Sequence, residues 1–216
     1  MFQIYLNAKS SPHSLETDSY KTILHPSDEI LLKEKNSKFF GYAFPVTSEE
    51  EVKAFLEQLR KKHHGAVHFC YAYQIGTHTI TFRANDDGEP GNSAGMPIYG
   101  QIQSFKVTNV LVVVVRFFGG VKLGVGGLMA AYKNAAQMAL EESEIIEKTI
   151  DVHFLISFGY KDINKVMRII KEKKLEVVSQ KMETDCEIEI SVRKKNEESI
   201  LQIFNSFFEI SIRKKD

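Results

Sequence analysis

Residues 110–132 read VLVVVVRFFGGVKLGVGGLMAAY. The first six residues of this stretch form a short β-branched run, which predicts a strand buried on both faces of a sheet. Arg116 ends this apolar run. From Leu128 onward, small and apolar residues recur at helical spacing, and we expect that helix to reach about Ser143. The stretch therefore predicts a strand, a glycine-rich loop and a helix in succession.

Glycines dominate the predicted loop. They are Gly119, Gly120, Gly124, Gly126 and Gly127. Glycine adopts positive φ and lets another backbone or a ligand approach closely. A glycine loop before a helix N-terminus, with positive charge from Arg116 and Lys122, is typical of an anion-binding site. The residues match neither G-x-x-x-x-G-K-[ST] nor G-x-G-x-x-G, which argues against both standard nucleotide motifs. The alternative is structural: the glycines let the helix pack tightly against the sheet.

A second cluster is acidic. Turn-forming residues fill positions 85–93, which we expect to form a loop, and Asp86, Asp87 and Glu89 lie in it. Such carboxylates could hold Mg²⁺ or transfer protons, but acids in a turn-rich loop more often act as turn and cap formers. They could also pair with Arg116 or Lys122 across the site, in a self-complementary patch. We therefore assign no catalytic residue, no metal ligand and no cofactor.

Composition limits the classes of function. The 216 residues contain 28 Lys plus Arg and 28 Asp plus Glu, so any nucleic-acid role needs a local basic surface. His68 and Cys70 lack a second ligand pair at zinc spacing, and Cys70 and Cys186 make no disulfide framework. No apolar run approaches the length of about 20 residues that spans a membrane, and the first residues do not resemble a signal peptide. We expect a cytoplasmic protein without a membrane partner.

The rest of the first half alternates between strands and helices. We expect a poorly ordered extension over residues 1–18. Ser48 and Glu51 form a capping box, with the serine at the helix start and the glutamate reaching back to it. Gly76-Thr77 suits a type II′ turn of a hairpin. The predicted strands are 20–24, 29–34, 39–45, 66–75 and 79–83, and the predicted helices are 52–62 and 94–104.

A change of composition near residues 145–151 predicts a domain boundary, with domains at 19–147 and 148–216. Beyond it the periodicity alternates between strands and helices in the order β-α-β-β-α-β, which predicts a ferredoxin-like fold. The predicted strands are 152–158, 175–181, 186–193 and 207–213, and the predicted helices are 162–173 and 197–205. Basic clusters at the ends of these elements are typical of solvated faces.

Several segments together resemble the signature of the YigZ/IMPACT family. They are Asp86-Asp87-Gly88-Glu89-Pro90, residues 113–124, residues 126–128 and Ala131-Tyr132. The resemblance covers roughly residues 37–140, and the two-domain layout is similar to that of bacterial YigZ-type members. It implies an α+β fold with two domains. The first would be ribosomal protein S-five domain two-like, similar to domain IV of elongation factor G, and the second ferredoxin-like, similar to its domain V.

The resemblance also implies a function. Eukaryotic relatives act in translational control by competing for the activator of an amino-acid-starvation kinase. This implies a role in regulation of translation. From the basic glycine loop we further predict a non-enzymatic protein that contacts RNA or the ribosome through Arg116, Lys122 and the loop backbone. A first alternative is a regulator whose same face docks a protein. A second is a Mg²⁺-dependent enzyme that acts on a phosphorylated substrate through Asp86, Asp87 or Glu89.

This sequence departs from the family pattern at the start of the helix. Ala130 stands where the family's G-L-V-R-A-Y has arginine, so one positive charge is missing beside the glycine loop.

Overall fold

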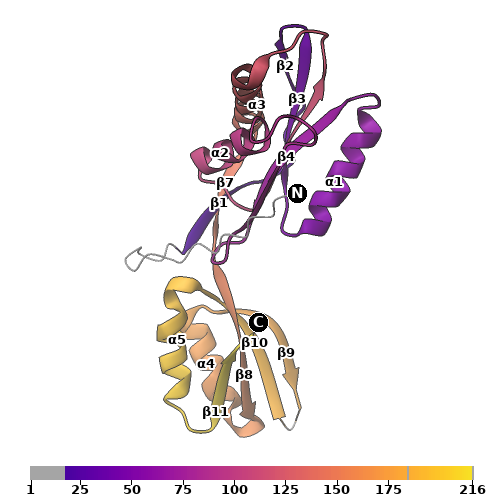
Figure 1. Cartoon of the computed structure of the whole chain (residues 1–216). Coiled ribbons are helices and arrows are strands. Elements are labelled where there is room, and N and C mark those ends of the chain that lie inside the picture. The colour runs from indigo at the N-terminus through magenta and orange to yellow at the C-terminus, as the bar shows by residue number, and fades with distance from the viewer. Residues whose placement is uncertain (1–17, 184, 216) are drawn as a thin grey trace. The chain divides into compact units, whose positions relative to one another are not determined.

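The computed structural model describes residues 18–183 and 185–215, so the predicted extension lies, except for Asp18, outside the described residues. The chain divides into two compact units: residues 20–148, and the described residues from Thr149 onward together with Asp18 and Ser19 (Figure 1). We call them the N-terminal unit and the C-terminal unit. Both mix helices with strands, which confirms the predicted α+β class.

A five-stranded antiparallel sheet forms the centre of the N-terminal unit, in the order β2-β3-β6-β4-β5. The strands are β2 Ile30–Glu34, β3 Ser37–Pro45, β4 His68–Ile75, β5 Thr81–Asn85 and β6 Val110–Phe117. The run Val110 to Val115 is fully buried in the central strand β6, as its composition predicts. Arg116 does not end that strand: it lies opposite Phe39 on one side and His68 on the other, so the ladder continues past it.

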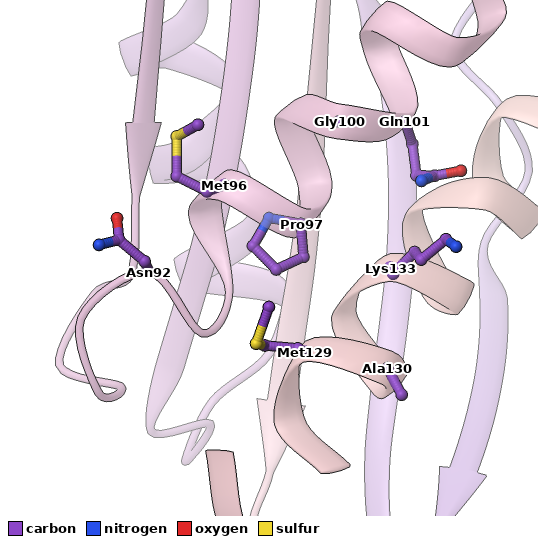
Figure 2. A pocket seen from close by; sticks show the side chains of 8 residues that line it. All are labelled: Asn92, Met96, Pro97, Gly100, Gln101, Met129, Ala130 and Lys133. Carbon is purple, nitrogen blue, oxygen red and sulfur yellow. The ribbon is translucent and has the colours of Figure 1, made fainter. Parts of the chain in front are cut away.

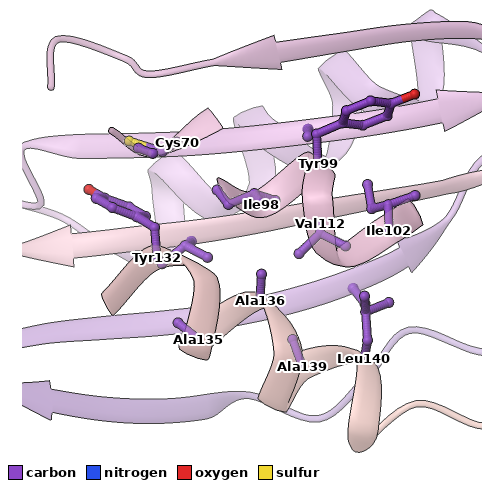
Figure 3. Packing of buried hydrophobic residues seen from close by; sticks show 14 of the residues in the cluster. Cys70, Ile98, Tyr99, Ile102, Val112, Tyr132, Ala135, Ala136, Ala139 and Leu140 are labelled. Carbon is purple, nitrogen blue, oxygen red and sulfur yellow. The ribbon is translucent and has the colours of Figure 1, made fainter. Parts of the chain in front are cut away.

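Helices cover both faces of this sheet (Figure 1). The helices are α1 Glu49–Lys62, α2 Gly95–Phe105 and α3 Gly124–Glu141. Val110, Val112 and Val114 of β6 share a core with α2 and α3, part of which is shown in Figure 3. The intervening residues Leu111 and Val113 share the other core with α1. This division follows from the two-residue period of a strand, which sends successive side chains to opposite faces.

Three local predictions need correction. The hairpin is not closed by a two-residue turn: Ile75 pairs with Thr81, which leaves a five-residue connection in which only Gly76 has positive φ. Helix α3 begins at Gly124, within the glycine-rich stretch, rather than at Leu128. An additional strand, β7 Ile145–Thr149, pairs with β1 Ser19–Ile23 where the sequence showed only a change of composition.

The predicted start of α1 is confirmed with one difference. Ser48 accepts a hydrogen bond from the Glu51 amide through its side chain, at 3.3 Å, as expected of the helix cap. The Glu51 carboxylate reaches back to the Ser48 backbone, as a capping box predicts, and also accepts from the Thr47 amide at 2.6 Å, one residue further back.

The C-terminal unit has the predicted ferredoxin-like arrangement, with the antiparallel strand order β11-β8-β10-β9. Its elements are β8 Asp151–Gly159, α4 Ile163–Lys173, β9 Glu176–Met182, β10 Asp185–Arg193, α5 Glu197–Asn205 and β11 Ile210–Lys214. Phe154 and Ile156 of β8 pack with Val166 of α4 and Phe204 of α5 in one core. None of the helices in the part of the chain that the structure describes is long and apolar enough to cross a membrane.

Candidate functional site

Arg116 lies near the end of β6 and turns its guanidinium into the protein. Its Nη1 lies 2.6 Å from Oε1 of Glu89, and the two side chains are only 5% and 4% exposed. Nη2 donates to the Ser37 hydroxyl at 3.4 Å. The guanidinium also lies over the rings of Phe39 and Phe118, 5.4 Å from each centroid. Arg116 is therefore a buried, paired cation rather than an exposed one.

Glu89 connects three elements through one carboxylate. Its Oε1 accepts the hydroxyl of Tyr132 on α3 at 2.8 Å, in addition to the Arg116 guanidinium of β6. Nε2 of His68 on β4 lies 3.9 Å from the same oxygen. Burial, reinforced by Cys70 and Glu89, raises the pKa of Tyr132 far above its usual value, so the tyrosine stays a hydrogen-bond donor. We call Arg116, Glu89, Tyr132 and His68 the Arg116–Glu89 cluster.

Asp86 caps helix α2 from outside the helix. Its Oδ1 accepts from the backbone amides of Ala94 at 2.9 Å and Gly95 at 2.8 Å, and its Oδ2 accepts from Asn92 at 2.9 Å. A carboxylate at this position satisfies amides that have no partner within the helix and suits the positive end of the helix dipole. Asp86 is therefore a cap former in this structure.

Asp87 ties the same loop to β4 and α1. Its Oδ2 accepts from the Phe69 amide at 2.7 Å, and its Oδ1 lies 3.4 Å from Nη2 of Arg60. Cys70 next along β4 is fully buried, and burial raises the pKa of its thiol well above the usual value, which argues against a nucleophilic thiolate. No group of three or more His, Cys, Asp or Glu side chains within residues 18–183 and 185–215 is placed to hold a metal ion.

The glycine-rich stretch lies against the hairpin between β2 and β3. A Cβ added at Gly119 would lie 2.1 Å from the carbonyl carbon of Asn36, and the Gly119 amide donates to Ser37 Oγ at 3.2 Å. Gly120 and Gly124 have φ of +84° and +72°, which side-chain-bearing residues rarely adopt. Gly126 has open space around it, and Gly127 packs on Leu123.

The solvent side of this stretch carries apolar and basic side chains. Phe118, Val121 and Val125 are 50%, 45% and 54% exposed, and Lys122 is exposed as well. The adjoining hairpin presents three further exposed lysines, which are Lys33, Lys35 and Lys38. Within the described residues none of these four lysine side chains has an ion-pair or hydrogen-bond partner. We call Lys35, Phe118 and Lys122, which are carried by the two segments that touch at Asn36 and Gly119, the lysine–glycine face.

The structure separates residues that the sequence grouped together. Arg116 pairs with Glu89, as in the self-complementary alternative, whereas Lys122 remains free for a ligand. Sequence reasoning missed Ser37 and Tyr132 as partners of the buried pair. Tyr132 carried a signal, since it is the one aromatic residue in the alanine-rich segment 130–136.

The fold and this site define a two-unit α+β protein in which a buried arginine–glutamate pair supports an exposed basic loop. The family model described as Impact N-terminal domain matches residues 35–140. The IMPACT family member YvyE of Bacillus subtilis is 32% identical over 154 residues, which is 71% of this chain and 70% of YvyE. An IMPACT family member of Haemophilus influenzae is 31% identical over 183 residues, covering 82% of this chain and 87% of the relative.

The chain belongs to the IMPACT family, as its signature segments predict. A solved structure described as a crystal structure of a hypothetical protein matches 93% of this chain and 98% of its own, with a TM-score of 0.68 and 22% identity. That likeness shows the fold.

Proposed function

We propose that this chain is a non-enzymatic RNA-binding protein that acts in regulation of translation. Membership of the IMPACT family supports the translational role, because the resemblance implies it for eukaryotic relatives. The observation that supports RNA as the ligand is the lysine–glycine face. It presents unpaired lysines from two loops beside a half-exposed aromatic ring.

The charge of this face is local and positive. Residues 33–38 and 118–127 contain four lysines and one glutamate, in a chain with no net charge. The two segments touch where Gly119 meets the backbone of Asn36. Lysines without protein partners attract phosphate and release its counterions. The ring of Phe118 offers a surface on which a base of single-stranded RNA can stack.

Arg116 takes a supporting role in this proposal. Its place beside the glycines predicted contact with RNA, but its side chain is 5% exposed and bonded to Glu89. It lies beneath the ring of Phe118 and so helps to hold that ring at the surface. The cation that meets phosphate is Lys122, together with Lys35.

The test is RNA binding by the double variant Lys35→Ala/Lys122→Ala. Fluorescence anisotropy with a labelled single-stranded oligouridine should show weaker binding, by about tenfold, and a smaller dependence of log affinity on log salt, by about one. The control variant is Lys171→Ala/Lys173→Ala, which removes two exposed lysines from α4 of the other unit. It should bind like the wild type.

Equal affinity and an equal salt slope in wild type and Lys35→Ala/Lys122→Ala would refute the proposal. Ribosome co-sedimentation gives a second readout, because RNA-dependent association should disappear after nuclease treatment. An association that survives nuclease and is lost in Val121→Ser/Val125→Ser would instead favour protein docking by the exposed valines.

A further inference from the structure

A groove of about 460 Å³ lies between α2 and α3 of the N-terminal unit. Met96 and Pro97 of α2 and Met129 and Ala130 of α3 line it, and Figure 2 shows Pro97 directed toward Met129. It shares no residue with the lysine–glycine face or with the Arg116–Glu89 cluster. A volume of a few hundred Å³ is that of a pocket for a small ligand or a few side chains.

The floor of the groove is apolar and adaptable. Met96 and Met129 are each 45% exposed, a large fraction for residues of this kind. Methionine has an unbranched, polarizable side chain that fits ligands of different shapes, and exposed apolar patches with polar rims often mark docking sites. Ala130 is exposed and leaves the floor open, whereas an arginine there would put a long charged side chain into the groove.

The polar end of the groove has two groups without partners. Gln101 is only 8% exposed, yet its amide has no hydrogen-bond partner among the described residues. The exposed part of Gln101 includes its amide, which is therefore open to a ligand that can donate to it or accept from it. Lys133 of α3 is exposed and has no ion pair within the described part of the chain. Figure 2 shows the two side chains extending from α2 and α3 toward the same space.

The charge of the groove selects its ligand. Its lining holds one cation, Lys133, and no acidic residue. An apolar side chain seated against Pro97 and Met129 would be accompanied by a carboxylate at Lys133 and by a peptide group at Gln101, which can both donate and accept. We propose that the α2–α3 groove docks a short apolar–acidic peptide segment of a partner protein. This adds a second binding site to the RNA-binding function and does not depend on it.

The first experiment identifies the peptide. A random dodecamer phage library is panned against the immobilised full chain, with the Ala130→Arg variant for counter-selection. We expect enriched sequences that combine apolar residues with aspartate or glutamate. No enrichment over the counter-selected variant, or enrichment of sequences without an acidic residue, would overturn the proposal.

The second experiment measures the selected peptide on designed variants by fluorescence polarization. Ala130→Arg and Lys133→Glu should each weaken binding by about tenfold or more. The control Met138→Ala changes another exposed methionine of α3 that does not line the groove, and it should bind like the wild type. Because both groove substitutions are at exposed positions, circular dichroism should show unchanged melting.

Charge reversal makes the test specific. A peptide whose acidic residue is replaced by lysine should bind Lys133→Glu better than it binds the wild type. The RNA-binding variant Lys35→Ala/Lys122→Ala should bind the original peptide normally, which separates this proposal from the function of the lysine–glycine face. Equal binding by Ala130→Arg and wild type would overturn the docking proposal. The proposal would also be overturned if analytical sedimentation showed a wild-type dimer that the groove variants dissociate, because a second copy of the chain would then occupy the groove.

Discussion

Arg116 and Glu89 join strand β6 to the loop after β5 through a contact of 2.6 Å between two nearly fully buried side chains. Tyr132 adds a bond from α3 to the same carboxylate oxygen. The pair therefore fastens the acidic loop, the central strand and the helix after the glycine-rich stretch to one another. Its charges balance inside the protein, where an unpaired charge is costly.

Removal of the Arg116 charge should destabilise the N-terminal unit. Arg116→Met leaves the Glu89 carboxylate buried without its cation, at a cost of about 3–5 kcal/mol. Glu89→Gln in the same chain keeps an acceptor for Tyr132 and removes the unpaired charge. The double variant Arg116→Met/Glu89→Gln should therefore regain part of the lost stability in urea denaturation. A double variant as unstable as the sum of both single variants would show that the two residues are not coupled.

Gly119 and Gly126 should respond in opposite ways to alanine. At Gly119 the new methyl group would lie 2.1 Å from Asn36, so the hairpin or the loop must move. At Gly126 nothing lies within 4 Å, and the residue is in the first turn of α3. We expect Gly119→Ala to lower the melting temperature and Gly126→Ala to leave it unchanged or raise it, since alanine favours helix by about 1 kcal/mol over glycine. Thermal unfolding by circular dichroism measures both, and similar losses in the two variants would contradict this account.

His63 should make the N-terminal unit sensitive to mild acid. It ends α1, is 8% exposed, and lies 2.5 Å from the Tyr42 hydroxyl through Nε2. Burial lowers its pKa below 6.5, more than the nearby Glu29 raises it, and Lys62 lowers it further. The unfolded state then binds more protons than the folded state just below pH 6.5, so stability falls as the pH falls through this range.

We expect the melting temperature of the wild type to drop between about pH 7 and pH 5.5, and that of His63→Gln to drop less. The pKa of Glu29 is lowered, chiefly by the Tyr42 hydroxyl, so its contribution is present above pH 4.5 and is lost only at lower pH. The two effects therefore fall in different pH ranges. If the melting temperatures of wild type and His63→Gln change equally with pH above pH 5.5, His63 is not the origin of the loss of stability in mild acid.

Asp86 should stabilise helix α2 as a remote cap. Asp86→Ala removes the acceptor of three backbone amides, and we expect a loss of about 1–3 kcal/mol, since the Ala94 amide is in a buried residue. Asp86→Asn keeps an oxygen acceptor and should lose less. Urea denaturation of the two variants measures the difference. If Asp86→Ala leaves the free energy of unfolding unchanged, Asp86 does not stabilise α2 as a cap.

Magnesium should leave the melting temperature unchanged at saturating concentration. A ligand that binds only the folded state raises that temperature. The carboxylates of Asp86 and Asp87 accept from backbone amides, and that of Glu89 is bonded to Arg116 and Tyr132. A clear rise in the melting temperature with Mg²⁺ that is absent in Asp87→Asn would support a metal-dependent activity.

Local patterns predicted most of the elements correctly. The run Val110 to Val115 specifies a central strand because branched side chains suit burial on both faces. Ser48 marks the start of α1 because its hydroxyl can reach an amide within the same turn. The alternation of strands and helices after Thr149 was enough to predict the ferredoxin-like order. Periodicity and capping act over a few residues, so they can be recognised without the fold.

Tertiary structure decided which of the predicted site residues are accessible. In the sequence Arg116 and Lys122 look alike, as two cations beside the glycines. Only folding brings Glu89, 27 residues away, against Arg116 and leaves Lys122 in solvent. The groove between α2 and α3 likewise depends on how two helices pack, since Gln101 and Lys133 are far apart in the sequence and line one space only in the folded chain. The sequence alone determined the family, the elements and the glycine-rich stretch, whereas burial and pairing arise from contacts between distant residues and so were decided by the fold.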